Sequence, residues 1–226
     1  MADPVIAVLA GTNGAGKSSV GGALVEQHGG SYFNPDRVAG EIHAERPRLP
    51  IKECNSLAWQ EGLRQLRKAI EQRKDFTFES TLGGSTMTDE LLRAAASGCE
   101  VCIWYVGLAS AELHIERVAA RVAQGGHDIP EADIRRRFDR SRENLVRLIP
   151  KVTELKLFDN SAAANPRPEP TLLLHLRGGA RVAPDAQALA RTPDWAKPVV
   201  EAALQWLERK SRRRYRKPRR KGTPGA

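Results

Sequence analysis

The residue types and spacing most suited to chemistry lie near the N-terminus. The chain carries Gly11-Thr12-Asn13-Gly14-Ala15-Gly16-Lys17-Ser18, which fits the pattern G-x-x-x-x-G-K-[ST]. Glycines in such a loop let consecutive backbone N–H groups face phosphate oxygens, and the positive end of the following helix adds a favourable field. The pattern assigns Lys17 to the β- and γ-phosphates and the Ser18 hydroxyl to Mg²⁺. We expect ATP, with Mg²⁺, to contact Gly11, Thr12, Asn13, Gly14, Ala15, Gly16, Lys17, Ser18 and Ser19.

A candidate general base follows the second apolar run of the chain. Ligands of open α/β sheets bind at the carboxyl ends of the strands, and Asp36 lies at such a point, in Phe33-Asn34-Pro35-Asp36-Arg37. A carboxylate there could orient an acceptor hydroxyl and take its proton. The alternative, to which we give equal weight, is that Asp36 only caps the helix that follows.

Glu79 ends a third run, in which Phe76 and Phe78 alternate with other residues. A charge beside these apolar side chains is costly unless the carboxylate is used. Its use would be to bind a substrate hydroxyl or to contact Mg²⁺ through water, and the alternative is an exposed strand terminus. The residues expected to bind the acceptor are Asp36, Arg37, Glu79, Ser80 and Thr81.

A second basic cluster lies in the middle of the chain. Arg117 and Arg121 are four residues apart on one helix face, and Arg135–Arg137 follow the hinge Gly125-Gly126-His127-Asp128. Two helices joined by such a hinge suit a lid that closes over a triphosphate and neutralises charge. The alternative is a solvated face paired with neighbouring acids, which accounts for at least half of these arginines. The residues assigned to catalysis are Asp36, Lys17, Arg117, Arg121 and Arg137, and His127 is expected to buttress the hinge.

These residues need a framework in which strands alternate with helices. Strands are predicted at Val5–Ala10, Ser31–Phe33, Phe76–Phe78, Val101–Leu108 and Lys156–Phe158, with a candidate edge strand at Leu172–His175. Helices are predicted at 16–28, from 36 onward, and at 52–73, 89–97, 110–124, 130–149 and 195–209. The pattern favours an α/β fold of the P-loop NTPase or kinase-like class. Its mostly parallel sheet would have about five to six strands, helices on both faces and an arginine-bearing helical lid at about 111–149.

Composition separates the body of the chain from its end. The 226 residues carry a net charge of +9, and residues 209–221 hold ten Lys and Arg and no acid. Subtracting these ten charges leaves −1 for the remainder, so we expect a domain at 1–208 and a basic, disordered tail at 209–226. Three cysteines do not make a disulfide framework, and no stretch approaches the ~20 apolar residues of a membrane helix. A cytoplasmic protein is therefore expected.

Taken together, these motifs resemble those of the zeta-toxin-like P-loop kinases. The likeness rests on Gly11–Ser18, Asn34–Arg37, Phe78–Thr81, the two arginine helices and Phe158-Asp159-Asn160-Ser161, in consistent order. It implies ATP- and Mg²⁺-dependent phosphorylation of a sugar hydroxyl on UDP-N-acetylglucosamine, with Asp36 as base, and an antitoxin protein as partner. One departure is that those toxins carry an arginine shortly after Glu-x-Thr, where this chain has Leu82-Gly83-Gly84.

Two other functions remain open at the level of sequence. The basic tail could bind a nucleic acid that is the substrate of an end kinase or processing ATPase, or it could bind polyanions weakly. The phosphate-binding loop could instead serve a non-catalytic switch that binds ATP to control a partner. The leading hypothesis is a small-molecule kinase.

Overall fold

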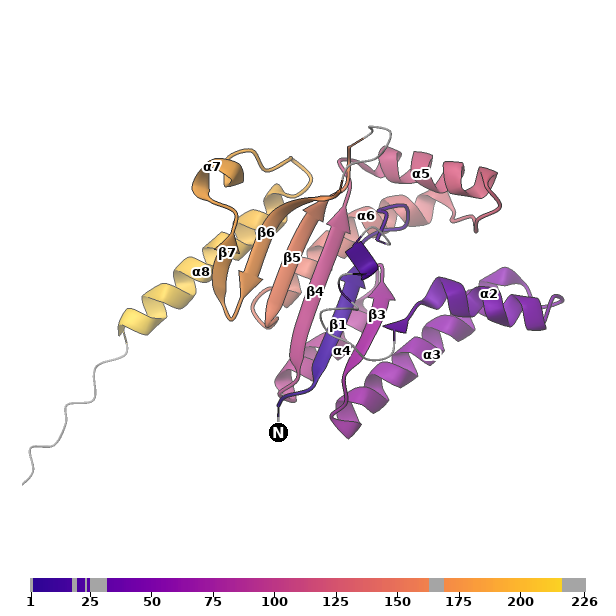
Figure 1. Cartoon of the computed structure of the whole chain (residues 1–226), viewed down its shortest axis with the longest axis horizontal. Helices are drawn as coiled ribbons and strands as arrows, with labels where there is room; N and C mark the ends of the chain where they lie inside the picture. The colour runs from indigo at the N-terminus through magenta and orange to yellow at the C-terminus, as the bar shows by residue number, and fades with distance from the viewer. Residues whose placement is uncertain (1, 18–19, 23, 25–31, 163–168, 217–226) are drawn as a thin grey trace, which may run out of the picture.

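The described residues form one sheet of seven strands. The computed structural model describes residues 2–17, 20–22, 24, 32–162 and 169–216, the last four of these by their backbone only. The strands are β1 (Val5–Ala10), β2 (Tyr32–Phe33), β3 (Phe76–Ser80), β4 (Glu100–Gly107), β5 (Glu154–Asp159), β6 (Thr171–Arg177) and β7 (Ala180–Ala183). Their order across the sheet is β2-β3-β1-β4-β5-β6-β7 (Figure 1). The first five run parallel and the last two antiparallel, which confirms the predicted mostly parallel α/β fold.

Helices connect and cover these strands. They are α2 (Pro35–Glu45), α3 (Ile51–Gln72), α4 (Ser85–Ala96), α5 (Ala111–Ala123), α6 (Glu131–Leu148), α7 (Ala186–Leu189) and α8 (Lys197–Arg216). The predicted helix at 16–28 is described only in part, because residues 25–31 lie outside the described ranges.

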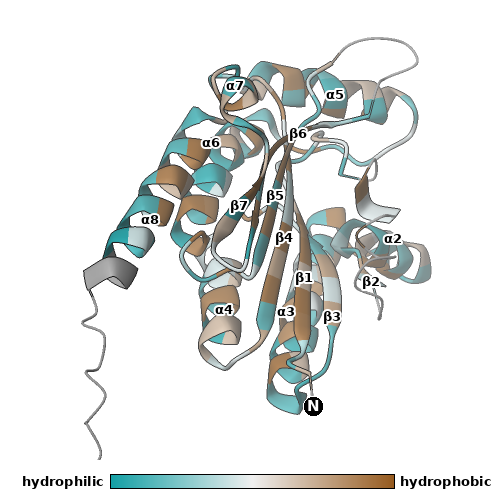
Figure 2. Ribbon diagram, turned by 60° about the vertical axis from the view of Figure 1, so that its left-hand side comes forward, coloured by the Kyte–Doolittle hydropathy of each residue, from teal (hydrophilic) through white to brown (hydrophobic). Residues whose placement is uncertain are grey.

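The core lies on both faces of the sheet because successive strand side chains point in opposite directions. On β1, Ile6 and Val8 belong to a large cluster that also contains residues of α3, α4, α6 and α8. Ala7 and Leu9 belong to a second cluster with Val20 and Leu24. Figure 2 shows the apolar colour running along the central strands between the layers. The near-continuous apolar runs of the sequence are thus the buried central strands.

The C-terminal edge of the sheet differs from the prediction. Leu172–His175 was expected at an edge, but β6 is internal and β7 forms the edge. The two strands are joined at Gly178 and Gly179, whose φ angles of 58° and 75° are those of a tight hairpin turn. The predicted number of five to six strands was therefore too low. Ala180–Ala183 is short, and the preceding Gly178-Gly179 turn is its main signal in the sequence.

The last helix extends further than predicted. α8 continues to Arg216, so residues 209–216 of the expected disordered tail are helical, and residues 217–226 lie outside the described ranges. Trp206 and Leu207 pack against the core, and the Lys210 ammonium donates to the carbonyls of Gly178 and Gly179 at 3.3 and 3.4 Å. These contacts stabilise the helix past the predicted boundary at 208.

Part of the segment predicted as a lid, residues 111–149, belongs to the core. Leu145 and Leu148 of α6 are fully buried and belong to the large core cluster. The C-terminal half of α6 is therefore part of the domain body, and residues 111–149 do not form one peripheral unit. Among the described helices, none combines the length and apolarity needed to cross a membrane.

Candidate active site

The loop after β1 is pressed between β4 and α5, and its glycines make this possible. Gly11 has a φ of 142°, and a Cβ there would lie 2.2 Å from the Val106 carbonyl oxygen. Gly14 has a φ of 81°, and its Cβ would lie 2.7 Å from the His114 carbonyl oxygen. A side chain at either position would displace backbone, so the loop keeps its shape only with glycine there. This is the backbone cradle that phosphate binding requires.

Two buried side chains hold this loop in place. The Asn160 amide donates to the Ala15 carbonyl at 2.8 Å. The His114 ring nitrogen Nδ1 lies 2.7 Å from the Asn13 carbonyl oxygen, and because a carbonyl only accepts, Nδ1 carries the hydrogen. His114 is 1% exposed, and burial lowers its pKa to about 4. The sequence analysis did not identify His114. Its position four residues before Val118 places both on one face of the helix, which could have indicated that His114 is buried.

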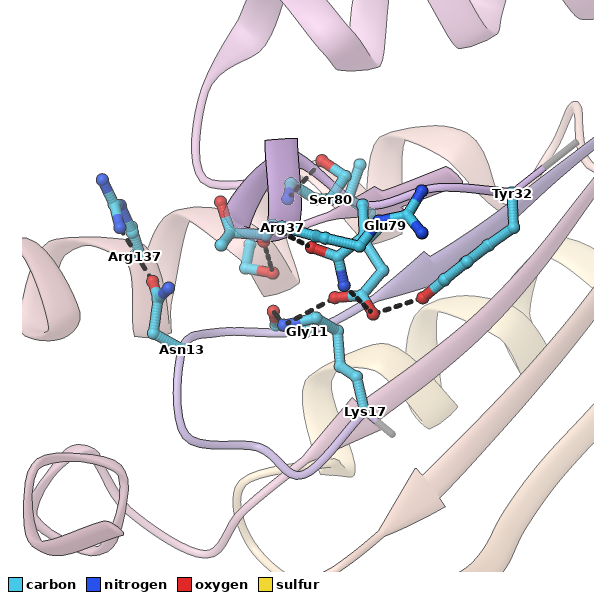
Figure 3. A network of polar contacts seen from close by, with 12 residues as sticks. Gly11, Asn13, Lys17, Tyr32, Arg37, Glu79, Ser80 and Arg137 are labelled. Atoms are coloured by element: carbon cyan, nitrogen blue, oxygen red, sulfur yellow. Dashed lines mark hydrogen bonds and ion pairs between the residues drawn. The ribbon is translucent and has the colours of Figure 1, made fainter. Parts of the chain in front are cut away.

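Lys17 lies beside the end of β3. Its Nζ donates to the Gly11 carbonyl at 3.2 Å and lies 3.8 Å from Oε2 of Glu79 (Figure 3). Ser18 and Ser19, expected to contact Mg²⁺ and the nucleotide, lie outside the described residues.

Glu79 is a partly buried carboxylate with three partners. Its Oε1 accepts hydrogen bonds from the Tyr32 hydroxyl and from the Asn34 amide, the latter at 3.0 Å (Figure 3). The side chain is only 14% exposed, so it is not a solvated strand end. Burial and the neighbouring Glu79 raise the pKa of the Tyr32 hydroxyl far above its ordinary range.

The start of α2 separates two roles that the sequence left open for Asp36. Asn34 is the N-cap, and its side-chain oxygen accepts from the Arg37 backbone N–H at 3.1 Å. Capping therefore does not account for Asp36, which lies in the first helical turn and lines a cavity. Arg37 turns instead to Glu41, 3.6 Å away on the exposed side of the helix, and does not line the cavity.

Of the three arginines expected to be catalytic, Arg137 reaches the cavity. Its guanidinium donates to the Asn13 side-chain oxygen at 2.7 Å, and burial lowers its pKa (Figure 3). Gly83 makes room for it, because a Cβ there would lie 2.7 Å from Arg137 Cγ. Arg117 donates to the Ala162 carbonyl and Arg121 to the His127 carbonyl, at 3.3 and 2.7 Å, and neither lines the cavity.

The loop between β3 and α4 is held rigidly by α6. The Ser141 hydroxyl donates to the Thr81 carbonyl at 2.6 Å. The Asn144 amide donates to the carbonyls of Leu82 and Gly84 at 2.7 and 3.2 Å. Leu82 has a φ of 49°, an unfavourable backbone conformation for leucine that these bonds support. Ser80 and Thr81 line the cavity, and their hydroxyls accept from N–H groups within the loop.

These elements enclose one cavity of about 350 Å³ at the carboxyl ends of β1 and β3. That volume is within the range of small-molecule sites. Its polar lining includes Asn13, Lys17, Asp36, Lys52, Asn55, Ser56, Glu79, Ser80, Thr81 and Arg137. The part contributed by α3 was missed from the sequence, although Lys52, Asn55, Ser56 and Trp59 recur at the spacing of one helix face.

Comparison with known proteins places the chain in a family. A model of the AAA domain family AAA_33 matches residues 6–145, and the chain belongs to this family. A protein of Haemophilus influenzae (strain ATCC 51907 / DSM 11121 / KW20 / Rd), described as uncharacterized, is 30% identical over 128 residues. The match covers 57% of this chain and 88% of that protein.

Solved structures share the fold at low sequence identity. A chain of the AvrRxo1-ORF1:-ORF2 complex with ATP gives a TM-score of 0.60 at 18% identity, covering 85% of this chain and 64% of that chain. This protein thus spans less than two thirds of that relative. The PezAT toxin–antitoxin system of Streptococcus pneumoniae gives a TM-score of 0.60 at 14% identity, covering 93% of this chain and 86% of that chain. The fold is therefore P-loop kinase-like.

Proposed function

We propose that this protein is an ATP- and Mg²⁺-dependent kinase of the zeta-toxin-like type that phosphorylates a hydroxyl of a small molecule. The observation that carries the proposal is the cavity in which Lys17, Asp36 and Arg137 meet. It brings Lys17 of the glycine-built loop together with the Arg137 guanidinium and the Asp36 carboxylate, and phosphoryl transfer needs positioning and charge stabilisation more than covalent chemistry. The AvrRxo1 structure with ATP supports ATP as the donor, because it shares this fold.

Each residue has a role in the proposed reaction. The acceptor oxygen forms a bond to the γ-phosphorus while the bond to the β,γ-bridging oxygen breaks and ADP leaves. Asp36 orients the acceptor hydroxyl and takes its proton. Lys17 and Arg137 neutralise the charge on the transferring group. Arg117 and Arg121 are given no role in this step, because they donate to backbone carbonyls and do not line the cavity.

The donor set fits a hard cation. Glu79 lines the cavity with its Oε2 3.8 Å from Lys17 Nζ, and carboxylate and hydroxyl oxygens are the ligands that Mg²⁺ prefers. Ser18, with Glu79 through water, would hold the ion, and bound Mg²⁺ would neutralise charge on the β- and γ-phosphates.

The acceptor is chosen from the resemblance, and the partner from the resemblance together with two solved structures. UDP-amino sugars are the first acceptors to test. An antitoxin-like protein is the first partner to test, since the AvrRxo1-ORF1:-ORF2 structure is a complex and the PezAT structure concerns a toxin–antitoxin system. A nucleic-acid acceptor is not favoured, because the basic end of α8 lies beyond β7, away from the α2–α3 side of the sheet (Figure 1). Weak polyanion binding by that end is a separate property.

The decisive experiment is a screen for transfer of radiolabelled γ-phosphate from ATP to UDP-sugars, nucleosides, amino sugars and RNA 5′ ends. We expect Asp36→Asn to lower transfer by about 10²–10⁴-fold while ATP still binds. Glu41→Gln is the matched control, because Glu41 lies on the exposed side of the same helix, and it should retain activity. Retained transfer in Asp36→Asn would refute its role as base. Tight ATP binding with no transfer to any acceptor would indicate a nucleotide-dependent switch instead.

A further inference from the structure

Asn34 joins two elements of the candidate site. Its side-chain oxygen accepts from the Arg37 backbone N–H at 3.1 Å, and its side-chain nitrogen donates to Oε1 of Glu79 at 3.0 Å. A backbone N–H only donates and a carboxylate only accepts, so a single orientation of the amide satisfies both partners. Asn34 therefore ties the first turn of α2 to the end of β3.

The backbone holds Asn34 in place for this double contact. Pro35 is the first residue of α2, and a residue that precedes proline is restricted to extended conformations. Asn34 has a φ of −113° and a ψ of 110°, which is extended and is also typical of a helix N-cap. Its carbonyl accepts from the Val38 N–H at 3.1 Å. The Asn34 side chain and the first turn of α2 are therefore held together.

Glu79 anchors the other end of this link. Its Oε1 also accepts from the Tyr32 hydroxyl, and its Oε2 lies 3.8 Å from Lys17 Nζ (Figure 3). The Glu79 side chain is only 14% exposed, and a hydrogen bond sheltered from water is stronger than one in solvent. Because Lys17 belongs to the phosphate-binding loop, a continuous series of contacts runs from that loop through Glu79 and Asn34 to α2.

We propose that Asn34 is a positioning residue that holds the Asp36 carboxylate in place relative to Glu79 and the phosphate-binding loop. Asp36 lies two residues after Asn34 in the first turn of α2 and lines the cavity, whereas Asn34 does not. The inference rests on the proposed kinase function and adds to it a residue that aligns the acceptor hydroxyl with the γ-phosphate. Serine, threonine or aspartate would also cap α2, so the donor to Glu79 is what asparagine adds.

Two substitutions at Asn34 separate positioning from capping. Asn34→Ser keeps a side-chain oxygen that can cap α2 but is too short to reach Glu79 as well, and Asn34→Ala removes both contacts. We expect Asn34→Ala to lower both the midpoint of thermal unfolding and kcat for phosphate transfer. Asn34→Ser should recover most of the midpoint but not kcat, which should stay about 10- to 100-fold below wild type because the base is misplaced. The KM for ATP should be unchanged in Asn34→Ser, because Asn34 does not line the cavity.

Asp185→Ser is the matched control. Asp185 caps α7 by accepting from the Ala188 N–H at 2.8 Å, and it lies outside the cavity. Exchanging one capping side chain for another there should retain kcat. Recovery of both the midpoint and kcat in Asn34→Ser would overturn the proposal, since capping alone would then account for Asn34. A loss of kcat that is as large in the Asp36→Asn background as in wild type would also overturn it, because a missing base no longer needs positioning.

Hydrogen exchange of the Asn34 side-chain amide, followed by NMR, tests the link without any acceptor. We expect exchange to be at least about tenfold slower in wild type than in Glu79→Ala, because the carboxylate holds the amide hydrogens. Tyr32→Phe removes only the other donor to Glu79 and should keep the slow exchange. Equal exchange in wild type and Glu79→Ala would overturn the proposal.

The outcomes separate this inference from the kinase proposal. Slow, Glu79-dependent exchange without phosphate transfer to any acceptor would support the link between α2 and β3 and refute the kinase. Transfer with the same kcat in wild type and Asn34→Ser would support the kinase and refute the positioning role of Asn34.

Discussion

His114 makes the stability of the phosphate-binding region depend on pH. The ring is 1% exposed and donates to the Asn13 carbonyl, and burial lowers its pKa to about 4. In the unfolded chain the same side chain titrates near its ordinary pKa of about 6.5. Below that pH the unfolded chain therefore binds a proton that the folded protein excludes, and the free energy of unfolding falls.

The size of this effect follows from the two pKa values. Stability from neutral His114 is fully present above about pH 6.5 and is lost as the pH falls toward 4. Linkage gives a loss of about 2 kcal/mol by pH 5 and about 3 kcal/mol by pH 4. The free energy of unfolding of a native protein is usually about 5–15 kcal/mol, so this loss is a substantial fraction of it.

Urea unfolding between pH 4 and pH 7.5 measures how the free energy of unfolding depends on pH. Other groups also titrate in this range, so the informative quantity is the difference between wild type and His114→Gln, whose amide still donates but takes up no proton. We expect the variant to be less stable at pH 7.5 and the difference to shrink by about 2 kcal/mol at pH 5. His43→Gln is the control and should retain the wild-type dependence due to His114. A difference that stays constant with pH would refute the reasoning.

Two further substitutions test the cavity wall. Gly83→Ala places a Cβ 2.7 Å from Arg137 Cγ, so the guanidinium should shift and phosphate transfer should fall at least tenfold with little change in unfolding, whereas Gly40→Ala, on open helix surface, should retain activity. Equal activity of the two variants would contradict this. Asn144→Ala leaves the carbonyls of Leu82 and Gly84 without their shared donor, and urea denaturation should show a loss of about 2 kcal/mol. An unchanged midpoint would show that the loop does not need this donor.

Much of the fold could be predicted because its signals are local. The apolar runs of β1 and β4 and the helix predicted at 110–124 depend on neighbouring residues, and the structure has them within one residue or so of the expected bounds. β7 could not be recognised from its four residues, because a short edge strand needs little apolar character. The length of α8 depends on Lys210 meeting the hairpin at Gly179, a contact between distant parts of the chain.

In the candidate site, too, features set by neighbouring residues could be predicted and features set by distant contacts could not. The phosphate-binding loop is one continuous motif, so its glycines were identified directly. Which arginine enters the cavity depends instead on the space left by Gly83, and sequence periodicity does not encode that space. Asn34 rather than Asp36 as the cap of α2 was equally hidden, because both types are good caps and lie two residues apart.

The pairing of β4 with β5 limits which fragments of this chain can be studied. The family match ends at residue 145, yet β5 begins at Glu154 and pairs with β4 from Cys102 to Gly107. The Trp195 ring also covers Gly107, where a Cβ would lie 2.2 Å from it. A fragment ending at the family boundary would expose β4, a strand of buried apolar residues, as an open edge prone to aggregation. Expression trials of the matched segment alone would therefore give insoluble protein whether or not the full chain is a kinase.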